Sequence, residues 1–239
     1  MDIELQDKSY WNDLDSRLEE LLDKGFVKFP TIKPFDLDDV DKKISDEIKG
    51  NTFFEACNSH KNFLDKLNLN DFLVPKLFQI AKSNFGFKGE IDDQYHIARR
   101  VEPGNSKEMY RAHFDSHIFT MVIPIKIPNS SSSGSSGDLI FHPNSRENPN
   151  SEIVNILSKA YHKRYASKNG LEKFGKNHTQ LVDNFTDYRP LLFIGNTTLH
   201  TNKPVSLCCD SHRLTLLAHF FDSSSKYGIG SLLRLIRNR

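Results

Sequence analysis

The sequence predicts a mainly β fold whose antiparallel strands are supported by a helical N-terminal part. Three observations lead to this prediction. Apolar residues recur at helical spacing in the first third of the chain, the following part contains short runs rich in β-branched and aromatic residues, and no helix alternates regularly with those runs. An antiparallel sandwich or barrel is therefore favoured over a parallel α/β sheet.

The N-terminal part begins with a predicted surface helix that starts at a cap near Ser9 and ends at Gly25. Its buried stripe consists of Leu14, Leu18, Leu21 and Leu22. A short strand is expected at 26–29, because apolar and polar residues alternate there before Pro30. Helical order returns in three further ranges, 36–49, 53–66 and 70–84.

The β part begins near residue 91 and contains several predicted strands separated by polar turns. They are Tyr95 to Val101, Phe119 to Ile127, Asp138 to Phe141, Pro190 to Ile194 and Arg213 to Phe221. Between the second and the third lies 129–137, which is almost entirely serine and glycine. We expect this stretch to be too polar and flexible to pack, and to form either a lid over a site or a hairpin tip.

An insertion at about 144–188 interrupts the β part and contains a predicted amphipathic helix with Ser151 as its cap. The apolar stripe of this helix consists of Ile153, Val154, Leu157, Tyr161 and Tyr165. Basic residues lie beside it and downstream, namely Lys159, Lys163, Arg164, Lys168, Lys173 and Lys176. They form a solvated surface or attract an acidic substrate or carrier. The last residues, 231–239, predict a short basic amphipathic helix that packs on the barrel or on a second subunit.

Length and composition favour a single domain with a small partner. A chain of 239 residues can bury one large core, and its formal net charge of +1 gives no field that attracts nucleic acid or an anionic membrane. Cys57, Cys208 and Cys209 show no disulfide spacing, and the sequence has neither a secretory signal nor an apolar stretch of membrane-spanning length. We therefore expect a soluble, cytoplasmic protein, with a homo-oligomer formed through the insertion or the C-terminal helix as an open alternative.

His113 and Asp115 are the first candidates for a metal site. Residues two apart in a strand point to the same side, so both side chains can reach one ion while Phe114 packs elsewhere. The third ligand must come from a distant strand, and His200, which closes the run 193–200 and ends a predicted strand there, is the best placed. His117 is disfavoured because it lies about 13 Å along an extended strand from His113. Two imidazoles and one carboxylate suit Fe(II) and leave positions open for a cosubstrate and O2, although the same ligand types also suit zinc.

Arg213 and Thr215 are candidates for binding a dicarboxylic cosubstrate. The stretch 201–212 contains Pro204 and precedes an alternating run, which predicts a turn between antiparallel strands and places Arg213 near His200. A guanidinium can hold a carboxylate with two hydrogen bonds and a neighbouring hydroxyl can add a third. This arrangement suits the far carboxylate of 2-oxoglutarate.

In order and spacing, these residues resemble the motifs of the iron(II)/2-oxoglutarate-dependent dioxygenase superfamily. The matching residues are His113-x-Asp115, the distal His200, and Arg213-x-Thr215 in place of the family's Arg-x-Ser. Gly137 to Pro143 resembles the family's strand between the two metal-binding segments, and Gly25 to Pro30 resembles its early strand. The 13-residue gap from His200 to Arg213 is slightly longer than usual, and Lys203 is an alternative cation for the cosubstrate.

The resemblance implies a double-stranded β-helix of jelly-roll, cupin-like type. It implies one domain over 1–239, with a helical support region at 1–88, a β-helix core at 89–223 that carries the insertion, and a C-terminal helix at 224–239. It further implies that the two histidines and the aspartate hold Fe(II), and that O2 and 2-oxoglutarate are consumed with release of succinate and CO2. Hydroxylation is the family's commonest outcome. Desaturation, ring closure and epimerisation use the same ligands, whereas halogenation is disfavoured because Asp115 is present.

The sequence contains no signature of a particular substrate. We favour a small molecule, such as an amino acid or a natural-product intermediate, with Arg99, Tyr110 and Arg111 as candidates for contact with it. His219 is expected to be a structural or surface group, and His142 to lie near the site without an assigned role. The alternative function is a cupin-like metal-binding module without redox turnover, or a zinc-dependent hydrolase.

Overall fold

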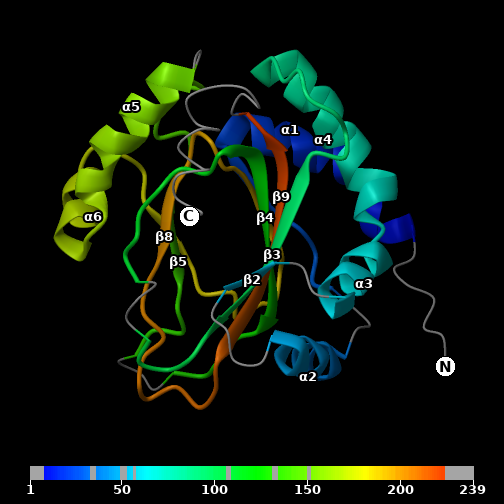
Figure 1. Ribbon diagram of the computed structural model, residues 1–239, viewed down its shortest axis with the longest axis vertical. Coiled ribbons are helices and arrows are strands. Elements are labelled where there is room, and N and C mark those ends of the chain that lie inside the picture. The colour runs from blue at the N-terminus through cyan, green and yellow to red at the C-terminus, as the bar shows by residue number, and fades with distance from the viewer. Residues whose placement is uncertain are drawn as a thin grey trace, which may run out of the picture.

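A computed structural model of the protein describes residues 8–32, 36–48, 53–55, 58–105, 109–130, 134–149 and 152–223. Two antiparallel sheets face each other, and helices cover the outer side of both (Figure 1). The fold is therefore a mixture of helices and antiparallel sheet, whereas the sequence predicted a mainly β chain.

The N-terminal helices agree with the predicted helical ranges in most places. A 3-10 helix, Lys8–Trp11, is followed by α1 (Leu14–Lys24), α2 (Leu37–Ile48), α3 (Asn58–Lys66) and α4 (Leu69–Phe85). Gly25 ends α1 in the left-handed conformation, with a φ of 81°, where a residue without a Cβ is unstrained. The predicted cap near Ser9 is wrong, because α1 follows Asp13. Leu22 is partly exposed and does not join the buried stripe.

Strand β2 (Phe53–Glu55) occupies the start of a range that the sequence predicted to be helical. It pairs with β3 (Gln94–Val101), so that Phe54 lies opposite Ala98. A strand distant in the sequence decides the conformation of this segment, and local periodicity does not reveal such a partner.

The larger sheet has six strands in the order β1-β7-β4-β9-β3-β2. The remaining bounds are β1 (Phe26–Lys28), β4 (His117–Lys126), β7 (Leu191–Ile194) and β9 (Arg213–Asp222). The register places Thr120 of β4 opposite His219 of β9, and Arg99 of β3 opposite Thr215 of β9. Opposed residues point to the same face, and so do residues separated by an even number along a strand. These four side chains therefore share one face, which is turned toward the smaller sheet.

The smaller sheet has three strands in the order β6-β5-β8, namely β6 (Leu181–Asp183), β5 (Leu139–His142) and β8 (Leu199–Asn202). The segment around His113 continues this sheet beyond β8, because His113 and His200 exchange both backbone hydrogen bonds, at 3.1 and 3.0 Å. The sequence did not predict β6, and it placed the end of a strand at His200, whereas β8 extends to Asn202.

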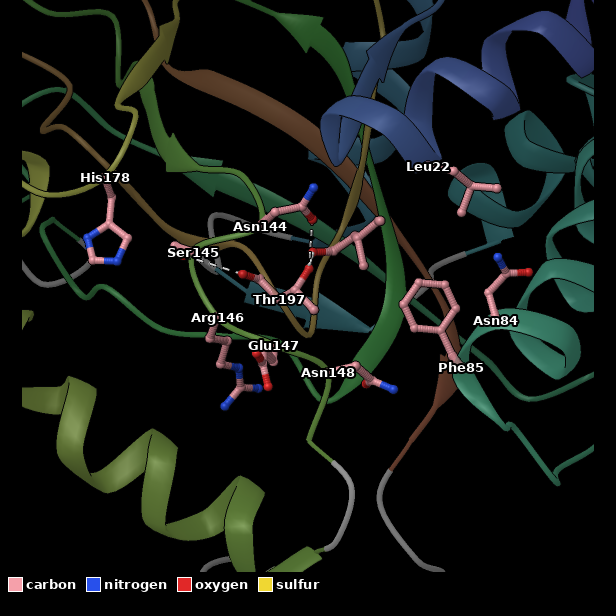
Figure 2. Close-up of a pocket in the computed structure, with 11 residues that line it drawn as sticks. Leu22, Asn84, Phe85, Asn144, Ser145, Arg146, Glu147, Asn148, His178 and Thr197 are labelled. Atoms are coloured by element: carbon pink, nitrogen blue, oxygen red, sulfur yellow. Dashed lines mark hydrogen bonds between the residues drawn. The ribbon is translucent and has the colours of Figure 1, made fainter.

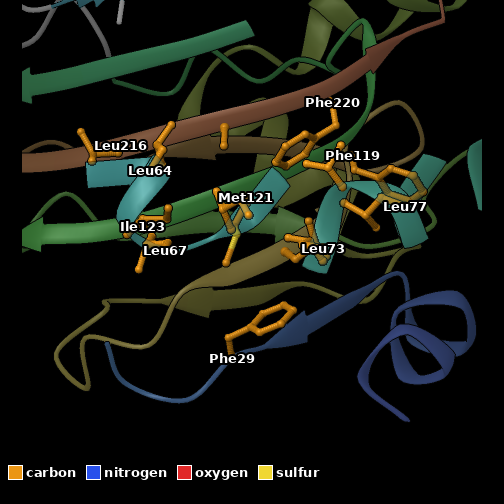
Figure 3. Packing of buried hydrophobic residues seen from close by; sticks show 14 of the residues in the cluster. Phe29, Leu64, Leu67, Leu73, Leu77, Phe119, Met121, Ile123, Leu216 and Phe220 are labelled. Atoms are coloured by element: carbon orange, nitrogen blue, oxygen red, sulfur yellow. The ribbon is translucent and has the colours of Figure 1, made fainter. Parts of the chain in front are cut away.

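Two of the apolar clusters fix the larger sheet to its neighbouring layers. The larger one lies between helices α1 to α4 and the outer face of the larger sheet, and it includes Phe29, Leu73, Met121, Leu216 and Phe220 (Figure 3). The other lies between the sheets and includes Val122, Leu139, Phe141, Leu191 and Phe193. Burial of apolar surface is the main favourable term in folding, so these clusters fix the sheets relative to each other.

The insertion forms α5 (Glu152–His162), a 3-10 turn (Lys163–Tyr165), α6 (Lys168–Gly175) and β6. Helix α6 packs on the outer side of the smaller sheet, where Leu171 and Phe174 meet Leu199. The predicted amphipathic helix is confirmed, but most of its apolar stripe is exposed. Ile153, Val154, Leu157 and Tyr161 are 46 to 64% exposed, and the predicted cap Ser151 lies outside the described residues.

The serine-rich loop packs more closely than its composition predicted. The backbone N–H of Ser135 donates to Ser206 Oγ at 2.8 Å, and Ser136 forms an isolated β-bridge with Val205. The expectation of an unpacked loop is therefore wrong for 134–137. The predicted C-terminal helix at 224–239 lies outside the described residues. Within the described ranges, no helix has the length and the hydropathy that crossing a bilayer requires.

Candidate functional site

The structure brings the three predicted metal ligands together at one end of the space between the sheets. His113 and Asp115 lie on the segment that precedes β4, and His200 lies on β8. One ligand atom from each of the three lies within 4.8 Å of the other two. The backbone pairing of His113 with His200 fixes this convergence, because it aligns the two side chains across adjacent strands.

The distances between the ligand atoms leave room for a cation. His113 Nε2 lies 3.5 Å from Asp115 Oδ1, and His200 Nε2 lies 3.6 Å from Asp115 Oδ2. Two donors that each lie about 2.1 Å from one ion are separated by about 3 to 4 Å. The side chain of His113 is 58% exposed, whereas Asp115 and His200 are almost buried, so the cluster opens to solvent on the His113 side.

Each of the two imidazoles is oriented by a contact with the backbone carbonyl oxygen two residues before it. His113 Nδ1 lies 2.8 Å from the carbonyl oxygen of Arg111, and His200 Nδ1 lies 3.1 Å from that of Thr198. A carbonyl oxygen only accepts, so each Nδ1 carries the hydrogen and donates it. When a ring is neutral, its Nε2 atom then presents a lone pair toward Asp115, as metal-binding histidines require.

The electrostatics of the cluster favour a charged carboxylate and a neutral His200. Burial alone would raise the pKa of Asp115, but the imidazoles of His200, His113 and His219 outweigh that effect and hold the pKa well below its usual range. Burial lowers the pKa of His200 to about 4. Burial also opposes protonation of His113, yet the contact with Asp115 prevails and raises the pKa of that imidazole.

Sequence reasoning missed two residues that contact Asp115 from the larger sheet. Thr120 Oγ1 lies 2.5 Å from Asp115 Oδ2 and 3.0 Å from His219 Nδ1. His219 Nδ1 is itself 3.8 Å from Asp115 Oδ2. The sequence predicted that His219 is a structural or a surface group. The surface alternative is wrong, because the side chain is buried beside the cluster. No local motif marks either residue, since the β4–β9 register alone brings them together.

The loop that follows β5 holds the segment that leads into His200. Arg146 Nε donates to the carbonyl oxygen of Asn196 at 2.7 Å, and the backbone N–H of Leu199 donates to Ser145 Oγ at 3.1 Å. This loop also borders a hollow of about 590 Å³ between itself, α1 and α4 (Figure 2). None of the three metal-ligand candidates lines that hollow, so it is separate from the cluster.

Arg213 and Thr215 are buried on the inner face of the larger sheet. Arg213 Nε and Thr215 Oγ1 have no hydrogen-bond partner among the described residues. Burial and the nearby Arg99 guanidinium lower the pKa of Arg213 to about 9. Gly137 makes room for the Arg213 side chain, because a Cβ there would lie 2.8 Å from Arg213 Cδ. Phe185 lies under the guanidinium, with 5.7 Å between Arg213 Cζ and the ring centroid.

Of the three residues predicted to contact a substrate, only Arg99 lies on the inner face. Its guanidinium donates to Asn202 Oδ1. Burial is the main cause of the lowered pKa values of His200 and Arg213, and the positive charge of Arg99 lowers both further. The Tyr110 ring packs against the apolar cluster beneath α6, and Arg111 is exposed.

Two further side chains from the sequence predictions are engaged elsewhere. Lys203 pairs with Asp138 at 3.0 Å at the edge of the smaller sheet. His142 is buried in the cluster of the insertion, against the Phe174 ring, with Nδ1 3.1 Å from the carbonyl oxygen of Thr179.

Comparisons with known proteins find similarity at the level of structure alone. No protein-family model matches the chain, and no curated protein matches it. A prolyl-4-hydroxylase from Pseudomonas putida superposes with a TM-score of 0.53 at 13% sequence identity, covering 92% of this chain and 99% of that one. A prolyl hydroxylase from Trichoplax adhaerens, in complex with a hypoxia inducible factor peptide fragment, gives a TM-score of 0.51 at 12% identity, covering 91% and 96%.

A third similar structure is the non-heme alpha ketoglutarate dependent carbocyclase SnoK from nogalamycin biosynthesis, with a TM-score of 0.50 at 11% identity, covering 92% of this chain and 89% of that one. The chain therefore shares its fold with these two prolyl hydroxylases and with this carbocyclase. The resemblance indicated by the sequence motifs is thereby confirmed at the level of the fold, and the cluster of His113, Asp115 and His200 agrees with it.

Proposed function

We propose that this protein is an Fe(II)- and 2-oxoglutarate-dependent oxygenase that hydroxylates a small molecule, such as an amino acid or a natural-product intermediate, and releases succinate and CO2. The main support is the convergence of His113, Asp115 and His200 on this fold, with both Nε2 atoms turned toward the carboxylate. The facing sheets correspond, in this proposal, to the double-stranded β-helix of a single domain.

In this proposal His113 Nε2, His200 Nε2 and one oxygen of Asp115 hold the iron. The bound iron supplies activation of O2, and three protein ligands on one face leave the remaining positions open for cosubstrate and O2. The chain's own contribution is to keep both rings in the Nδ1–H form through the carbonyl oxygens of Arg111 and Thr198. This arrangement fixes the direction of each lone pair before the metal arrives.

Arg213 and Thr215 bind the far carboxylate of 2-oxoglutarate in this proposal. The support is chemical, because a buried guanidinium nitrogen and a buried hydroxyl without partners are costly unless an anion or another acceptor satisfies them. The planar guanidinium can hold a carboxylate with two hydrogen bonds. Arg99 adds a second positive charge on the same face, which suits a cosubstrate with two carboxylates.

The substrate enters, in this proposal, on the exposed side of His113. Among the three predicted substrate contacts, Arg99 alone lies on the inner face, whereas the packing of Tyr110 against the cluster beneath α6 gives that residue a structural role. The similar structures include both prolyl hydroxylases and a carbocyclase, so their names do not decide between a peptide and a small molecule. Our preference for a small molecule rests on the balanced charge of the chain.

Anaerobic addition of Fe(II) and then 2-oxoglutarate to the purified protein tests the proposal. We expect a visible charge-transfer band, and oxygen-dependent formation of succinate once O2 is admitted. His113→Ala and Asp115→Ala should abolish both signals, and Arg213→Ala should weaken 2-oxoglutarate binding at least tenfold. Arg164→Ala removes an exposed arginine and should change neither signal.

The alternative functions predict different results. A metal-binding module without turnover would bind the metal but form no succinate. A zinc-dependent hydrolase would hydrolyse its substrate in the presence of zinc and would not give the charge-transfer band with Fe(II) and 2-oxoglutarate. If Arg213→Ala leaves the 2-oxoglutarate affinity unchanged, the assignment of the cosubstrate site is wrong.

A further inference from the structure

We propose that Thr120 and His219 are positioning residues that fix the Asp115 carboxylate, so that Oδ2 is held by the protein and Oδ1 is left to bind the metal. This inference rests on the proposed function, because it concerns how the chain prepares one ligand of the candidate iron site. It goes beyond that function by assigning roles to two residues of the larger sheet.

The directions of the hydrogen bonds follow from what each group can do. An ionised carboxylate only accepts, so the Thr120 hydroxyl donates its single hydrogen to Asp115 Oδ2 over 2.5 Å. The same hydroxyl oxygen can then only accept from the ring of His219, whose Nδ1 lies 3.0 Å away. His219 therefore carries its hydrogen on Nδ1. The chain of donors runs from the imidazole through the hydroxyl to the carboxylate.

The surrounding packing restricts rotation of this carboxylate. A Cβ at position 195 would lie 2.7 Å from Thr120 Oγ1 and 2.9 Å from Asp115 Oδ2, so only glycine allows the chain to pass this closely. The backbone N–H of Asp115 donates to the carbonyl oxygen of Gly195 at 3.1 Å, which fixes the base of the side chain. His219 packs in turn beside the rings of Tyr95 and His117, with centroids 6.2 and 5.1 Å away, and these two rings also contact each other.

The two carboxylate oxygens are thereby made unequal. Oδ2 accepts from Thr120 and lies 3.6 Å from His200 Nε2, while Oδ1 lies 3.5 Å from His113 Nε2 and accepts from no hydroxyl among the described residues, so the Thr120 hydrogen bond is what distinguishes the two oxygens. A carboxylate held in this way binds a metal through one oxygen. Binding through both oxygens would occupy one more coordination position, which an oxygenase needs for its cosubstrate or O2. Partners of metal ligands typically contribute about 10- to 100-fold to metal affinity or activity.

Titration of purified wild-type and variant protein with Mn(II) or Co(II), by calorimetry and by Co(II) absorption, tests the proposal without turnover. We expect Thr120→Val to weaken metal binding about 10- to 100-fold and to change the Co(II) spectrum, and Thr120→Ser to bind within about threefold of wild type. His219→Phe should weaken binding less, and the Thr120→Val/His219→Phe double variant should bind no more weakly than Thr120→Val, because His219 acts through Thr120.

A matched control removes a buried threonine hydroxyl that has no partner among the described residues. Thr201→Val does this on β8, next to His200, and should leave the metal affinity unchanged. Equal loss in Thr201→Val and Thr120→Val would overturn the proposal, since the effect would then come from packing. Wild-type affinity in Thr120→Val would overturn it as well, while leaving the proposed function intact.

The tautomer of His219 in the metal-free protein provides a second readout. Nitrogen-15 NMR of the histidine rings should show Nδ1–H at His219 in the wild type, and this preference should be lost in Thr120→Val. An Nε2–H tautomer in the wild type would contradict the proposed hydrogen bonds from His219 to Thr120 and from Thr120 to Asp115. This readout needs only the wild-type protein, so it does not depend on whether a variant folds. Wild-type protein that binds neither metal nor 2-oxoglutarate would reject the proposed function itself, and the positioning role with it.

Discussion

The two faces of the larger sheet differ in chemistry although the same strands form both. On β9, Leu214, Leu216, Ala218 and Phe220 point to the helix-covered face, where they are fully buried among apolar neighbours. The alternate residues Arg213, Thr215 and His219 point to the inner face. The first set contributes apolar burial, and the second places polar groups in a candidate site where some have no partner among the described residues.

This difference shows how one strand can serve stability and the candidate site at the same time. The side-chain period of two separates the two tasks onto opposite faces, so neither set of residues interferes with the other. A buried polar group without a partner costs free energy, so the inner face lowers the stability of the metal-free protein. The helix-covered face has to offset that cost.

The largest expected effect is on the helix-covered face. Phe220→Ala should lower the free energy of unfolding by about 3 to 5 kcal/mol, because it removes a fully buried ring and leaves a cavity. Urea unfolding followed by circular dichroism measures this change. The matched control is Leu157→Ala on α5, where the side chain is 64% exposed, and we expect a change within about 0.5 kcal/mol. Similar losses in both variants would contradict the division between the faces.

The second prediction concerns a polar exception in the helix-covered layer. His60 of α3 is fully buried, neither ring nitrogen has a hydrogen-bond partner among the described residues, and its ring lies 6.2 Å from that of His96. Burial, with smaller contributions from His96 and Lys61, lowers the pKa of His60 to about 3. The unfolded chain has a histidine pKa of about 6.5, so it binds more protons between these two values.

His60 makes the protein less stable toward acidic pH. Above about pH 6.5, His60 is neutral in both states and contributes no pH dependence. As the pH falls from there toward the folded pKa of about 3, only the unfolded chain binds the proton, so the free energy of unfolding decreases. Between pH 7 and pH 5, this group should account for about 2 kcal/mol of lost stability. His60→Leu should remove that part of the loss in parallel urea titrations at the two pH values. An unchanged pH dependence in the variant would mean that His60 is protonated in the folded protein.

The smallest expected effect has the opposite sign and lies on the inner face. Arg213→Met should raise the free energy of unfolding of the metal-free protein by about 1 kcal/mol, because an apolar chain of similar length replaces a buried charge. The same substitution should weaken 2-oxoglutarate binding at least tenfold if Arg213 holds the cosubstrate. Thermal unfolding and ligand titration on one preparation measure both quantities. A variant that is less stable than the wild type would show that Arg213 has an anionic partner within the protein.

The candidate metal ligands were predictable from the sequence because their chemistry is local. His113 and Asp115 are two apart in an extended segment, so the chain itself puts them on one side. The order of His200, Arg213 and Thr215 behind them gave the family resemblance, and the structure buries the side chains of these last three residues.

The residues that sequence reasoning missed lack such a local signal. Thr120 and His219 meet through the β4–β9 register, and Gly137 makes room for Arg213, which is distant in the chain. The exposed apolar stripe on α5 could not be predicted either. Helical periodicity predicts that a helix has an apolar face, but it does not predict whether another part of the chain covers that face.

By itself, the sequence determined the helices of the N-terminal part, most of the strands and the three candidate ligands, since short-range periodicity and the donor chemistry of side chains are properties of the residues. Only the tertiary structure decided that 53–55 is a strand, that His200 pairs with His113, and that a threonine and a histidine hold the aspartate. Those outcomes depend on sheet register, which is set by packing between segments that are far apart in the chain.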